Sequence, residues 1–338
     1  MPALHRPRLL VLAPDALFRS FFDEARQRRL SRGFRWSRSA ARTLEGVPRG
    51  VLAEADALVT TWDSPRFPAD ALRGAPRVRM IGHCGGEVKG RFAASLFDRV
   101  TITNAPGPMS RYVAELAVAV LLYGVRNVDA HRDALRRASN AVYARVHRDG
   151  LGDESLFGRT VGILGFGRIG RQVVALLRPF GARLLVHDPY VGAAAIRRAG
   201  ATPVTWSALL DGSRHLVLAA ALTEKTRGML GRRELARLPD GAMVVNVARG
   251  ALLDLDALTA EVRRGRIRCA LDVTDPEPLP LRHPLRRRRG VILTPHVGAG
   301  QREVRAAMAD VVLDDLDRFF AGRRPENRVS VDMLERMT

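Results

Sequence analysis

Three side chains in the last third of the chain have the types that acid–base chemistry on a carbonyl compound requires. Arg249, Glu277 and His296 each follow a short apolar run. An arginine can hold a carboxylate through two parallel hydrogen bonds and polarise the adjacent ketone. A histidine can give the new hydroxyl its proton, and a neighbouring carboxylate stabilises the imidazolium. Together they have the chemistry that reduction of a 2-keto acid needs.

The apolar runs at 243–246, 269–272 and 291–293 predict the strands that position this set. In an open parallel sheet, ligands bind outside the carboxyl ends of the strands, where the three residues fall. A single histidine after a strand is more often structural, and a single arginine is more often a surface charge. The occurrence of all three in order favours the catalytic interpretation.

A glycine-rich hexapeptide, Gly165-Phe-Gly-Arg-Ile-Gly170, lies between the apolar run 161–164 and the amphipathic stretch 171–178. A strand, a turn and a helix in this order are typical of a dinucleotide-binding fold. Gly165 is expected to make the tight turn, and Gly167 to let backbone amides approach a pyrophosphate. Gly170 is expected to allow close packing of the helix on the strand.

Asp188 directly follows the next predicted strand, 184–187, and lies eighteen residues after Gly170. A carboxylate at this position can accept hydrogen bonds from both ribose hydroxyls of the adenosine, and it repels a 2′-phosphate. Because no arginine follows directly, we expect NAD rather than NADP. The alternative is that Asp188 is a turn residue before Pro189.

These motifs carry a family resemblance. The hexapeptide, Asn246-x-x-Arg-Gly250, Leu271-Asp-Val-x-x-x-Glu-Pro278 and Thr294-Pro-His-x-Gly298 together resemble the D-isomer-specific 2-hydroxyacid dehydrogenase family. The similarity covers nearly the whole chain. It implies an NAD-dependent enzyme that transfers a hydride between the cofactor and a small 2-keto acid or D-2-hydroxy acid. No metal-binding spacing such as C-x-x-C is present.

The resemblance also assigns roles to residues. It implies that Arg249 binds and orients the substrate, that Glu277 pairs with the histidine, and that His296 is the acid and base. It places the nicotinamide carboxamide against Asp272 and the pyrophosphate against Arg168-Ile169. A loop cap is the alternative for Asp272.

The segment Gly82–Lys89 occupies the place of the family's substrate loop but departs from its usual sequence. Backbone amides at Gly85 and Gly86 can still cradle a carboxylate. Met109 stands where the family usually has an asparagine. These departures leave open which 2-hydroxy acid is the substrate.

Alternating strands and helices predict an α/β fold with two doubly wound domains. The resemblance implies that residues 105–299 form a central Rossmann domain for NAD. This domain is expected to be inserted in a discontinuous, flavodoxin-like lid domain of residues 1–104 and 300–338. Within the lid we expect one helix at 15–28, and we expect a hinge at the turn cluster 104–108.

Composition limits the compartment and the partners. An apolar content of 46% with 27% charged residues is typical of a soluble globular protein. No run approaches the roughly eighteen apolar residues of a membrane span, and the run 9–13 is too short for a signal segment. We expect a cytoplasmic protein with no membrane partner. The apolar stretch 111–123 predicts a helix buried in a core or subunit interface, and we expect a homodimer.

The net charge of +20 comes almost entirely from arginine, since Lys89 and Lys225 are the only lysines. Its spread along the chain indicates a compositional bias, so we expect no specific nucleic-acid partner. The dense run Arg286–Arg289 is interpreted as a solvated loop, with an anion contact as the alternative. Cys84 and Cys269 are expected to be buried thiols.

A rival interpretation is an NADH-sensing binding protein, similar to the corepressors that share this fold. The positive charge favours it, whereas the complete set of Arg249, Glu277 and His296 counts against it.

Overall fold

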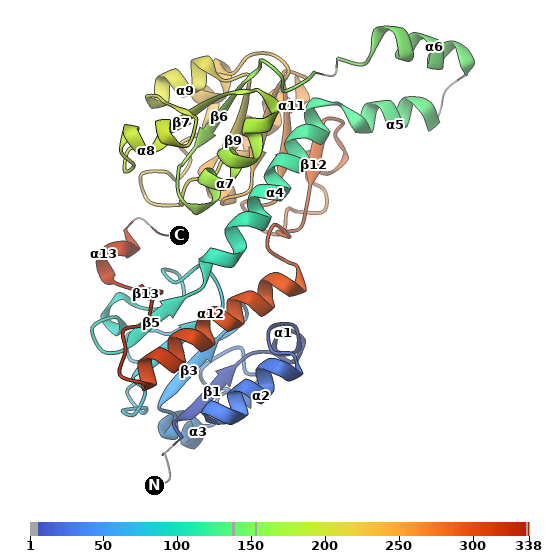
Figure 1. Ribbon diagram of the computed structural model, residues 1–338. Coiled ribbons are helices and arrows are strands. Elements are labelled where there is room, and N and C mark those ends of the chain that lie inside the picture. The colour runs from blue at the N-terminus through green and yellow to red at the C-terminus, as the bar shows by residue number, and fades with distance from the viewer. Residues whose placement is uncertain (1–5, 137–138, 153, 336, 338) are drawn as a thin grey trace. The chain divides into compact units, whose positions relative to one another are not determined.

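The computed structural model describes residues 6–136, 139–152, 154–335 and 337. The chain forms two compact units (Figure 1). Unit 1 contains Met1–Met109 and Ala299–Thr338, and unit 2 contains Ser110–Gly298. Each unit has its own sheet and its own buried apolar core. This is the α/β fold with two wound sheets that the sequence predicted.

The sheet of unit 1 has six strands in the order β13-β5-β4-β3-β1-β2. Strands β1 to β5 are parallel and follow the order of flavodoxin-like sheets, while β13 pairs antiparallel with β5 at one edge. The strands are β1 (Arg8–Leu12), β2 (Arg35–Ser39), β3 (Ala57–Thr60), β4 (Met80–His83), β5 (Thr101–Asn104) and β13 (Arg328–Val329).

Helices pack against this sheet. They are α1 (Asp15–Phe21), α2 (Glu24–Gly33), α3 (Arg49–Glu54), α12 (Arg302–Phe320) and α13 (Val331–Leu334), with a 3₁₀ turn at Ala94–Leu96. The expectation of one helix at 15–28 is wrong. The Asp23 side chain accepts a hydrogen bond from the Arg26 amide and so caps a second helix, α2. Helix α12, from the end of the chain, packs against α1, α2 and β4.

The sheet of unit 2 has seven parallel strands in the order β12-β11-β10-β9-β6-β7-β8. The direction of winding reverses between β6 and β9, so a ligand crevice is expected outside the carboxyl ends of these strands. The strands are β6 (Thr160–Leu164), β7 (Arg183–His187), β8 (Thr202–Pro203), β9 (His215–Leu218), β10 (Ala242–Asn246), β11 (Ile267–Leu271) and β12 (Val291–Leu293). The short β8 follows no apolar run from which a strand could be predicted.

The helices of the middle part of the chain precede and alternate with these strands. They are α4 (Pro106–Val125), α5 (Val128–Arg136), α6 (Asn140–Asp149), α7 (Arg168–Leu177), α8 (Ala193–Arg198), α9 (Trp206–Gly212), α10 (Arg232–Arg237) and α11 (Leu255–Arg263). Three 3₁₀ turns lie at Arg178–Phe180, Gly250–Leu252 and Pro284–Arg287.

Helix α4 differs from its prediction in length. It begins at Pro106, so most of the predicted turn cluster 104–108 forms the first turn of the helix. Proline is tolerated there because backbone N–H groups in the first turn have no partner within the helix. By length and composition alone the 20 residues of α4 could cross a membrane. Because Val113, Ala117 and Leu121 are buried, α4 is a core helix.

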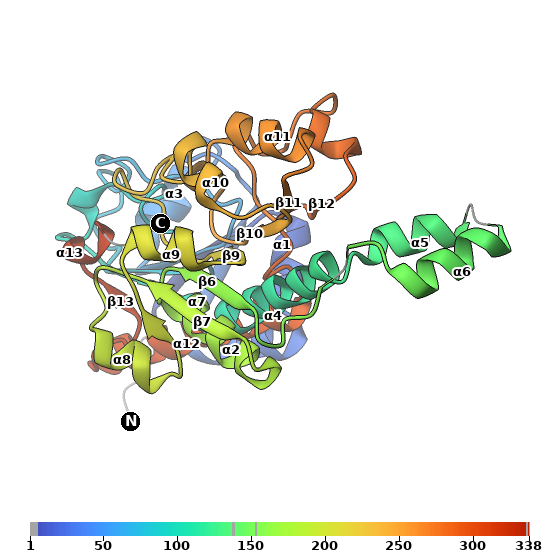
Figure 2. The same cartoon turned by 90° about the horizontal axis from the view of Figure 1, so that it is seen from above.

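Helices α5 and α6 form a hairpin that extends away from the rest of unit 2 (Figure 2). The two helices pack against each other. Val128, Leu135 and Tyr143 are exposed on them, with 54% of Leu135 and 55% of Tyr143 accessible. The hairpin therefore presents apolar side chains to solvent.

Candidate active site

The glycine turn at the end of β6 has the geometry of a nucleotide-binding turn. Gly165 has a φ of +93°, and a Cβ there would lie 2.7 Å from the Ala220 Cα atom, so no other residue fits. A Cβ at Gly170 would lie 2.1 Å from the Gly165 carbonyl oxygen, which shows how closely α7 approaches the strand. A Cβ at Gly167 would meet no atom within 4 Å. The middle glycine therefore faces open space at the N-terminus of α7, beside the exposed Arg168 and the half-buried Ile169.

Asp188 lies directly against this turn. One carboxylate oxygen accepts a hydrogen bond from the Phe166 amide at 2.7 Å, and the other accepts one from the Tyr190 amide at 2.9 Å. The second bond is that of a turn residue, as the alternative interpretation expected. The first bond ties Asp188 to the glycine turn.

Arg249 follows β10 on a turn that a buried side chain holds in place. Asn246 donates from its amide to the Arg249 carbonyl oxygen at 2.9 Å and accepts from the Ala248 amide at 3.1 Å. A Cβ at Gly250 would lie 2.1 Å from the Thr274 carbonyl carbon. The turn after β10 therefore packs directly on the loop after β11, which carries Glu277. The sequence analysis assigned Asn246 no role, although it stood inside the quoted motif.

Glu277 and His296 are brought together as predicted for a pair. The Nδ1 atom of His296 lies 2.7 Å from a carboxylate oxygen of Glu277. The two side chains are 49% and 43% exposed, so a solute can reach the other imidazole nitrogen. With Nδ1 engaged by a carboxylate, Nε2 can exchange a proton with a bound substrate.

Asp272 is almost fully buried at the end of β11. Its carboxylate accepts hydrogen bonds from the Thr294 hydroxyl at 2.6 Å, the Val297 amide at 2.9 Å and the Gly298 amide at 3.0 Å. These contacts are those of a loop cap, the alternative that the sequence left open. Thr294 is a second residue to which the sequence analysis gave no role.

In unit 1, the predicted substrate loop follows β4. The Gly85 amide donates to the His83 carbonyl oxygen at 2.8 Å, and the Gly85 carbonyl accepts from the Ala105 amide at 2.9 Å. The Asn104 side chain donates to the Gly86 carbonyl oxygen at 2.9 Å. The Gly85 amide is therefore already engaged within the loop, and an anion there would depend on the Gly86 amide.

Residues 118–298 match the NAD-binding domain of the D-isomer specific 2-hydroxyacid dehydrogenase family. The chain belongs to this family. It is an enzyme, an NAD(P)-dependent 2-hydroxyacid dehydrogenase, and α4 is a core helix of a soluble protein.

Individual relatives agree with this assignment. A glyoxylate reductase of Korarchaeum cryptofilum is 32% identical over 83% of this chain and 85% of its own length. A D-3-phosphoglycerate dehydrogenase of Methanocaldococcus jannaschii is 32% identical over 83% of this chain, but the match spans 52% of that longer protein. The crystal structure of an NADPH-dependent glyoxylate/hydroxypyruvate reductase of Sinorhizobium meliloti has a TM-score of 0.78 at 25% identity, covering 96% of this chain and 98% of that one.

Several other titratable groups of the dehydrogenase are buried. Burial lowers the pKa of His83 to about 3, and it lowers the pKa of His215 to about 4 despite the nearby Glu154 carboxylate. Burial also raises the pKa of the Cys84 and Cys269 thiols, that of Cys269 to about 12. Both thiols are free and fully buried, as expected. These groups are poorly placed for proton transfer at neutral pH.

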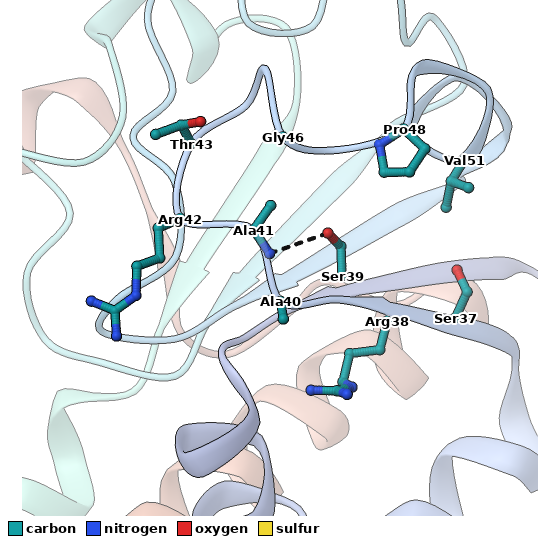
Figure 3. Close-up of a pocket in the computed structure, with 10 residues that line it drawn as sticks. All are labelled: Ser37, Arg38, Ser39, Ala40, Ala41, Arg42, Thr43, Gly46, Pro48 and Val51. Carbon is teal, nitrogen blue, oxygen red and sulfur yellow. Dashed lines mark hydrogen bonds between the residues drawn. The ribbon is translucent and has the colours of Figure 1, made fainter.

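A cavity in unit 1 lies beside the loop that follows β2 (Figure 3). Its volume is about 640 Å³, and it is lined by Ser37, Arg38, Ser39, Ala40, Ala41, Arg42, Thr43, Gly46, Pro48 and Val51. The polar groups here are largely engaged, since Arg38 pairs with Asp15 and the Ser39 hydroxyl accepts from the Ala41 amide. None of the predicted site residues lines this cavity.

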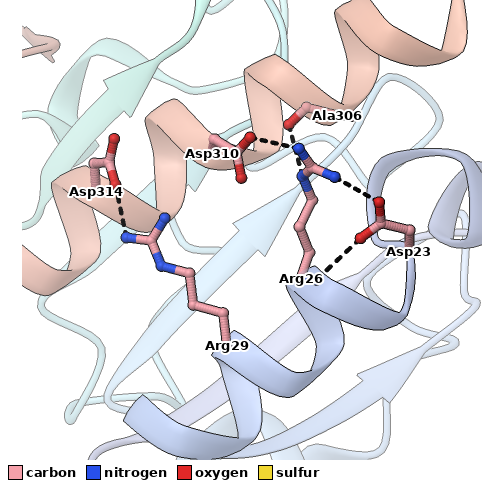
Figure 4. A network of polar contacts seen from close by, with 6 residues as sticks. All are labelled: Asp23, Arg26, Arg29, Ala306, Asp310 and Asp314. Carbon is pink, nitrogen blue, oxygen red and sulfur yellow. Dashed lines mark hydrogen bonds and ion pairs between the residues drawn. The ribbon is translucent and has the colours of Figure 1, made fainter.

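A charged cluster joins α2 to α12 in unit 1 (Figure 4). The Arg26 guanidinium donates to the carboxylates of Asp23 and Asp310 and to the Ala306 carbonyl oxygen. Arg29 pairs with Asp314 and Asp317. Because each arginine is matched by carboxylates, the cluster fastens the C-terminal helix to unit 1 and does not resemble a reactive site.

The arginine run Arg286–Arg289 is partly structural. Arg286 donates to the carbonyl oxygens of Leu279 and Pro280, and Arg288 donates to that of Arg263. All four side chains are exposed. The run is therefore a loop at the surface in which two arginines also hold the local backbone.

Proposed function

We propose that this dehydrogenase uses NAD(H) to interconvert a small 2-keto acid and its D-2-hydroxy acid. The observation that carries the proposal is the hydrogen bond of 2.7 Å between His296 and Glu277, on the loop against which the Arg249 turn packs. The three side chains follow adjacent strands β10, β11 and β12. They therefore lie at the carboxyl ends of the strands, where parallel sheets bind ligands.

The geometry of the pair supports the following roles. In the reducing direction, Nε2–H of the imidazolium gives its proton to the carbonyl oxygen, while Nδ1–H stays bound to Glu277. In the oxidising direction, Nε2 takes the hydroxyl proton. Arg249 binds the substrate carboxylate and polarises the ketone, and Asn246 fixes the backbone that carries it.

The turn from Gly165 to Gly170, with Arg168 and Ile169 in its second half, has the form of a pyrophosphate cradle. The open space at Gly167 and the N-terminus of α7 suit an anion. The Asp188 carboxylate stands beside the Phe166 amide, where it can bind ribose hydroxyls and repel a 2′-phosphate. When bound, the nicotinamide supplies or accepts the hydride.

We propose that unit 2 binds the cofactor and carries Arg249, Glu277 and His296, and that unit 1 supplies one further substrate contact. The Gly86 amide, whose neighbour Gly85 is already engaged, is the proposed backbone contact for the substrate carboxylate. Glyoxylate and hydroxypyruvate, the compounds named for the relatives, are the first candidates. The exposed apolar residues of the α5–α6 hairpin suit a homodimer contact, and the protein is proposed to act in the cytoplasm.

The test is NADH oxidation followed at 340 nm with a panel of 2-keto acids that includes glyoxylate and hydroxypyruvate. We expect turnover with at least one of them, and a higher kcat/KM with NADH than with NADPH. Asp188→Ala should bring the ratio of the two cofactors towards one, because it removes the charge that repels the 2′-phosphate. Equal use of both cofactors by the wild type would contradict the role of Asp188.

The same preparation tests the rival. An NADH-sensing binding protein would bind NADH and show negligible turnover on every keto acid in the panel. That result, with NADH binding intact, would remove the enzymatic proposal.

A further inference from the structure

The loop from Thr294 to Gly298 holds His296 in an unusual backbone conformation. His296 has a φ of +53°, in the left-handed region of the backbone map. Residues other than glycine adopt this region at a cost in conformational energy. Such conformations persist where the surrounding structure over-determines them, and they are concentrated at functional sites. Something outside the loop must therefore hold it.

Asp272 supplies that support from the neighbouring strand. Its carbonyl oxygen accepts from the His296 amide at 2.9 Å. Its carboxylate accepts from Thr294 before the histidine and from Val297 and Gly298 after it. A Cβ at Gly298 would lie 3.1 Å from the same carboxylate, so the loop closes tightly around it.

We propose that Asp272 is a positioning residue for His296. Its buried carboxylate gathers three donors of the loop and so fixes the imidazole in the direction that meets Glu277. This inference rests on the proposed function and names a residue on which proton transfer depends. Asp272 itself need not touch the substrate or the cofactor.

This role differs from the one that the family resemblance implies, in which Asp272 holds the nicotinamide carboxamide. A carboxylate has about four acceptor positions, and three of them are occupied by the loop within this chain. The two roles predict different kinetic results. A positioning role lowers kcat and leaves NADH binding intact, whereas a carboxamide contact weakens NADH binding when it is lost.

The test uses two variants with graded effects. In Asp272→Asn, one oxygen becomes an amide group that faces a donor of the loop, so at least one hydrogen bond is lost. We expect kcat to fall by about 10- to 100-fold, with the Kd for NADH, measured by fluorescence titration, within about threefold of wild type. Thr294→Val removes one donor without a change in charge, and a fall of about 3- to 10-fold is expected. Thr294→Ser restores the hydroxyl and should recover most of the activity.

A readout independent of turnover is the NMR chemical shift of the His296 Nδ1 proton, which reports the hydrogen bond to Glu277. In Thr294→Val this chemical shift should move towards that of Glu277→Gln, because the imidazole is no longer held against its partner. The control is Asp254→Asn, since Asp254 caps α11 by accepting from the Ala257 amide at 2.9 Å. That variant should keep wild-type kcat and an unchanged His296 chemical shift.

Two outcomes would overturn the inference. One is an unchanged kcat and an unchanged His296 Nδ1 proton chemical shift in Thr294→Val, which remains measurable if Asp272→Asn fails to fold. The other is wild-type kcat in Asp272→Asn with NADH affinity reduced more than about tenfold. Failure of the proposed function is distinguishable, because wild-type protein would then reduce no keto acid while the His296 Nδ1 proton chemical shift still responded to Thr294→Val.

Discussion

The histidines at the carboxyl ends of the two sheets, His83 and His296, have opposite environments. In unit 1, His83 ends β4 with 1% of its surface exposed, and its Nδ1 atom lies 2.9 Å from the Thr60 hydroxyl. In unit 2, His296 follows β12 with its side chain 49% exposed, beside a carboxylate. One histidine is locked in the core and neutral, and the other is accessible and paired.

The loops around them are fixed by different means. In unit 1, the Ser64 hydroxyl accepts from the Thr61 amide and donates to the Leu12 carbonyl oxygen, and Arg91 donates to the Trp62 carbonyl oxygen. In unit 2, the carboxylates of Asp188 and Asp272 gather amides of neighbouring loops. In unit 2 the pair of Glu277 and His296 is partly exposed, whereas in unit 1 the histidine at the end of the strand is buried. The comparison supports our proposal that the proton chemistry lies in unit 2.

The largest expected effect comes from removing the accessible histidine, His296. His296→Ala removes the proposed acid and base, so kcat should fall by about two to four decades. The Kd for NADH should barely change, because the glycine turn and Asp188 are untouched. Steady-state kinetics and a binding titration on the same sample measure both. His283→Ala, in the loop before β12, is the matched control and should retain kcat within about twofold. Near-wild-type turnover of His296→Ala would remove this residue from the mechanism.

The next effect concerns the buried histidine and is one of stability. Because burial lowers the folded-state pKa of His83 to about 3, the unfolded chain takes up the proton first as the pH falls below about 6.5. The contribution of neutral His83 to the free energy of unfolding is complete above that pH and is lost as the pH falls towards 3. Between pH 7 and pH 5, His83 should therefore cost about 2 kcal/mol of the free energy of unfolding.

Urea unfolding at pH 7 and pH 5 measures this loss. His83→Gln keeps a hydrogen-bonding group for Thr60 but does not titrate, so its stability should fall less between the two pH values. His147→Gln, at an exposed position on α6, should lose as much as the wild type. An identical loss in wild type and His83→Gln would mean that His83 is not the neutral buried group described here.

A smaller effect sharpens the role of the carboxylate partner. Glu277→Gln removes the anion 2.7 Å from the imidazole, so the protonated form is less stabilised. The alkaline limb of the pH profile for keto-acid reduction should move to lower pH, and kcat should fall by about tenfold. The partial exposure of both side chains keeps this effect below that of His296→Ala. A profile that stays in place would show that the pair does not form during turnover.

The smallest expected effect concerns the surface arginines. Replacing Arg287 and Arg289 with serine leaves the backbone contacts of Arg286 and Arg288 in place and removes two charges. Retention on duplex DNA should weaken at low salt and be largely lost by about 0.2 M salt in either protein. Keto-acid reduction should be unchanged within about twofold. Sequence-selective DNA binding that survives this salt would contradict the compositional interpretation of the charge.

The sequence predicted the strands that precede the candidate site residues, because their apolar runs are continuous. It gives no such signal for β2 (Arg35–Ser39), an edge strand with largely exposed arginines and serines. It also missed the two-residue strands β8 and β13. The break between α1 and α2 was hidden because the amphipathic pattern continues across the capping residue Asp23.

The candidate site was predictable to the level of motifs. The Arg249, Glu277 and His296 motifs stood in order, and the structure joins Glu277 to His296. The support of His296 by Asp272 was not predictable, because it depends on the pairing of β11 with β12 and on the backbone angle at His296. The engagement of the Gly85 amide by His83 is likewise a local geometry that composition does not encode.

The most direct test of the account is the configuration of the product. Wild-type enzyme is incubated with NADH and hydroxypyruvate, or with whichever keto acid of the panel turns over fastest to a chiral product, and the hydroxy acid is resolved on a chiral column. The account predicts the D-2-hydroxy acid alone, formed in equal amount to the NADH consumed, and a loss of that product in His296→Ala. The L-isomer, a racemic product, or NADH binding without any product would contradict it.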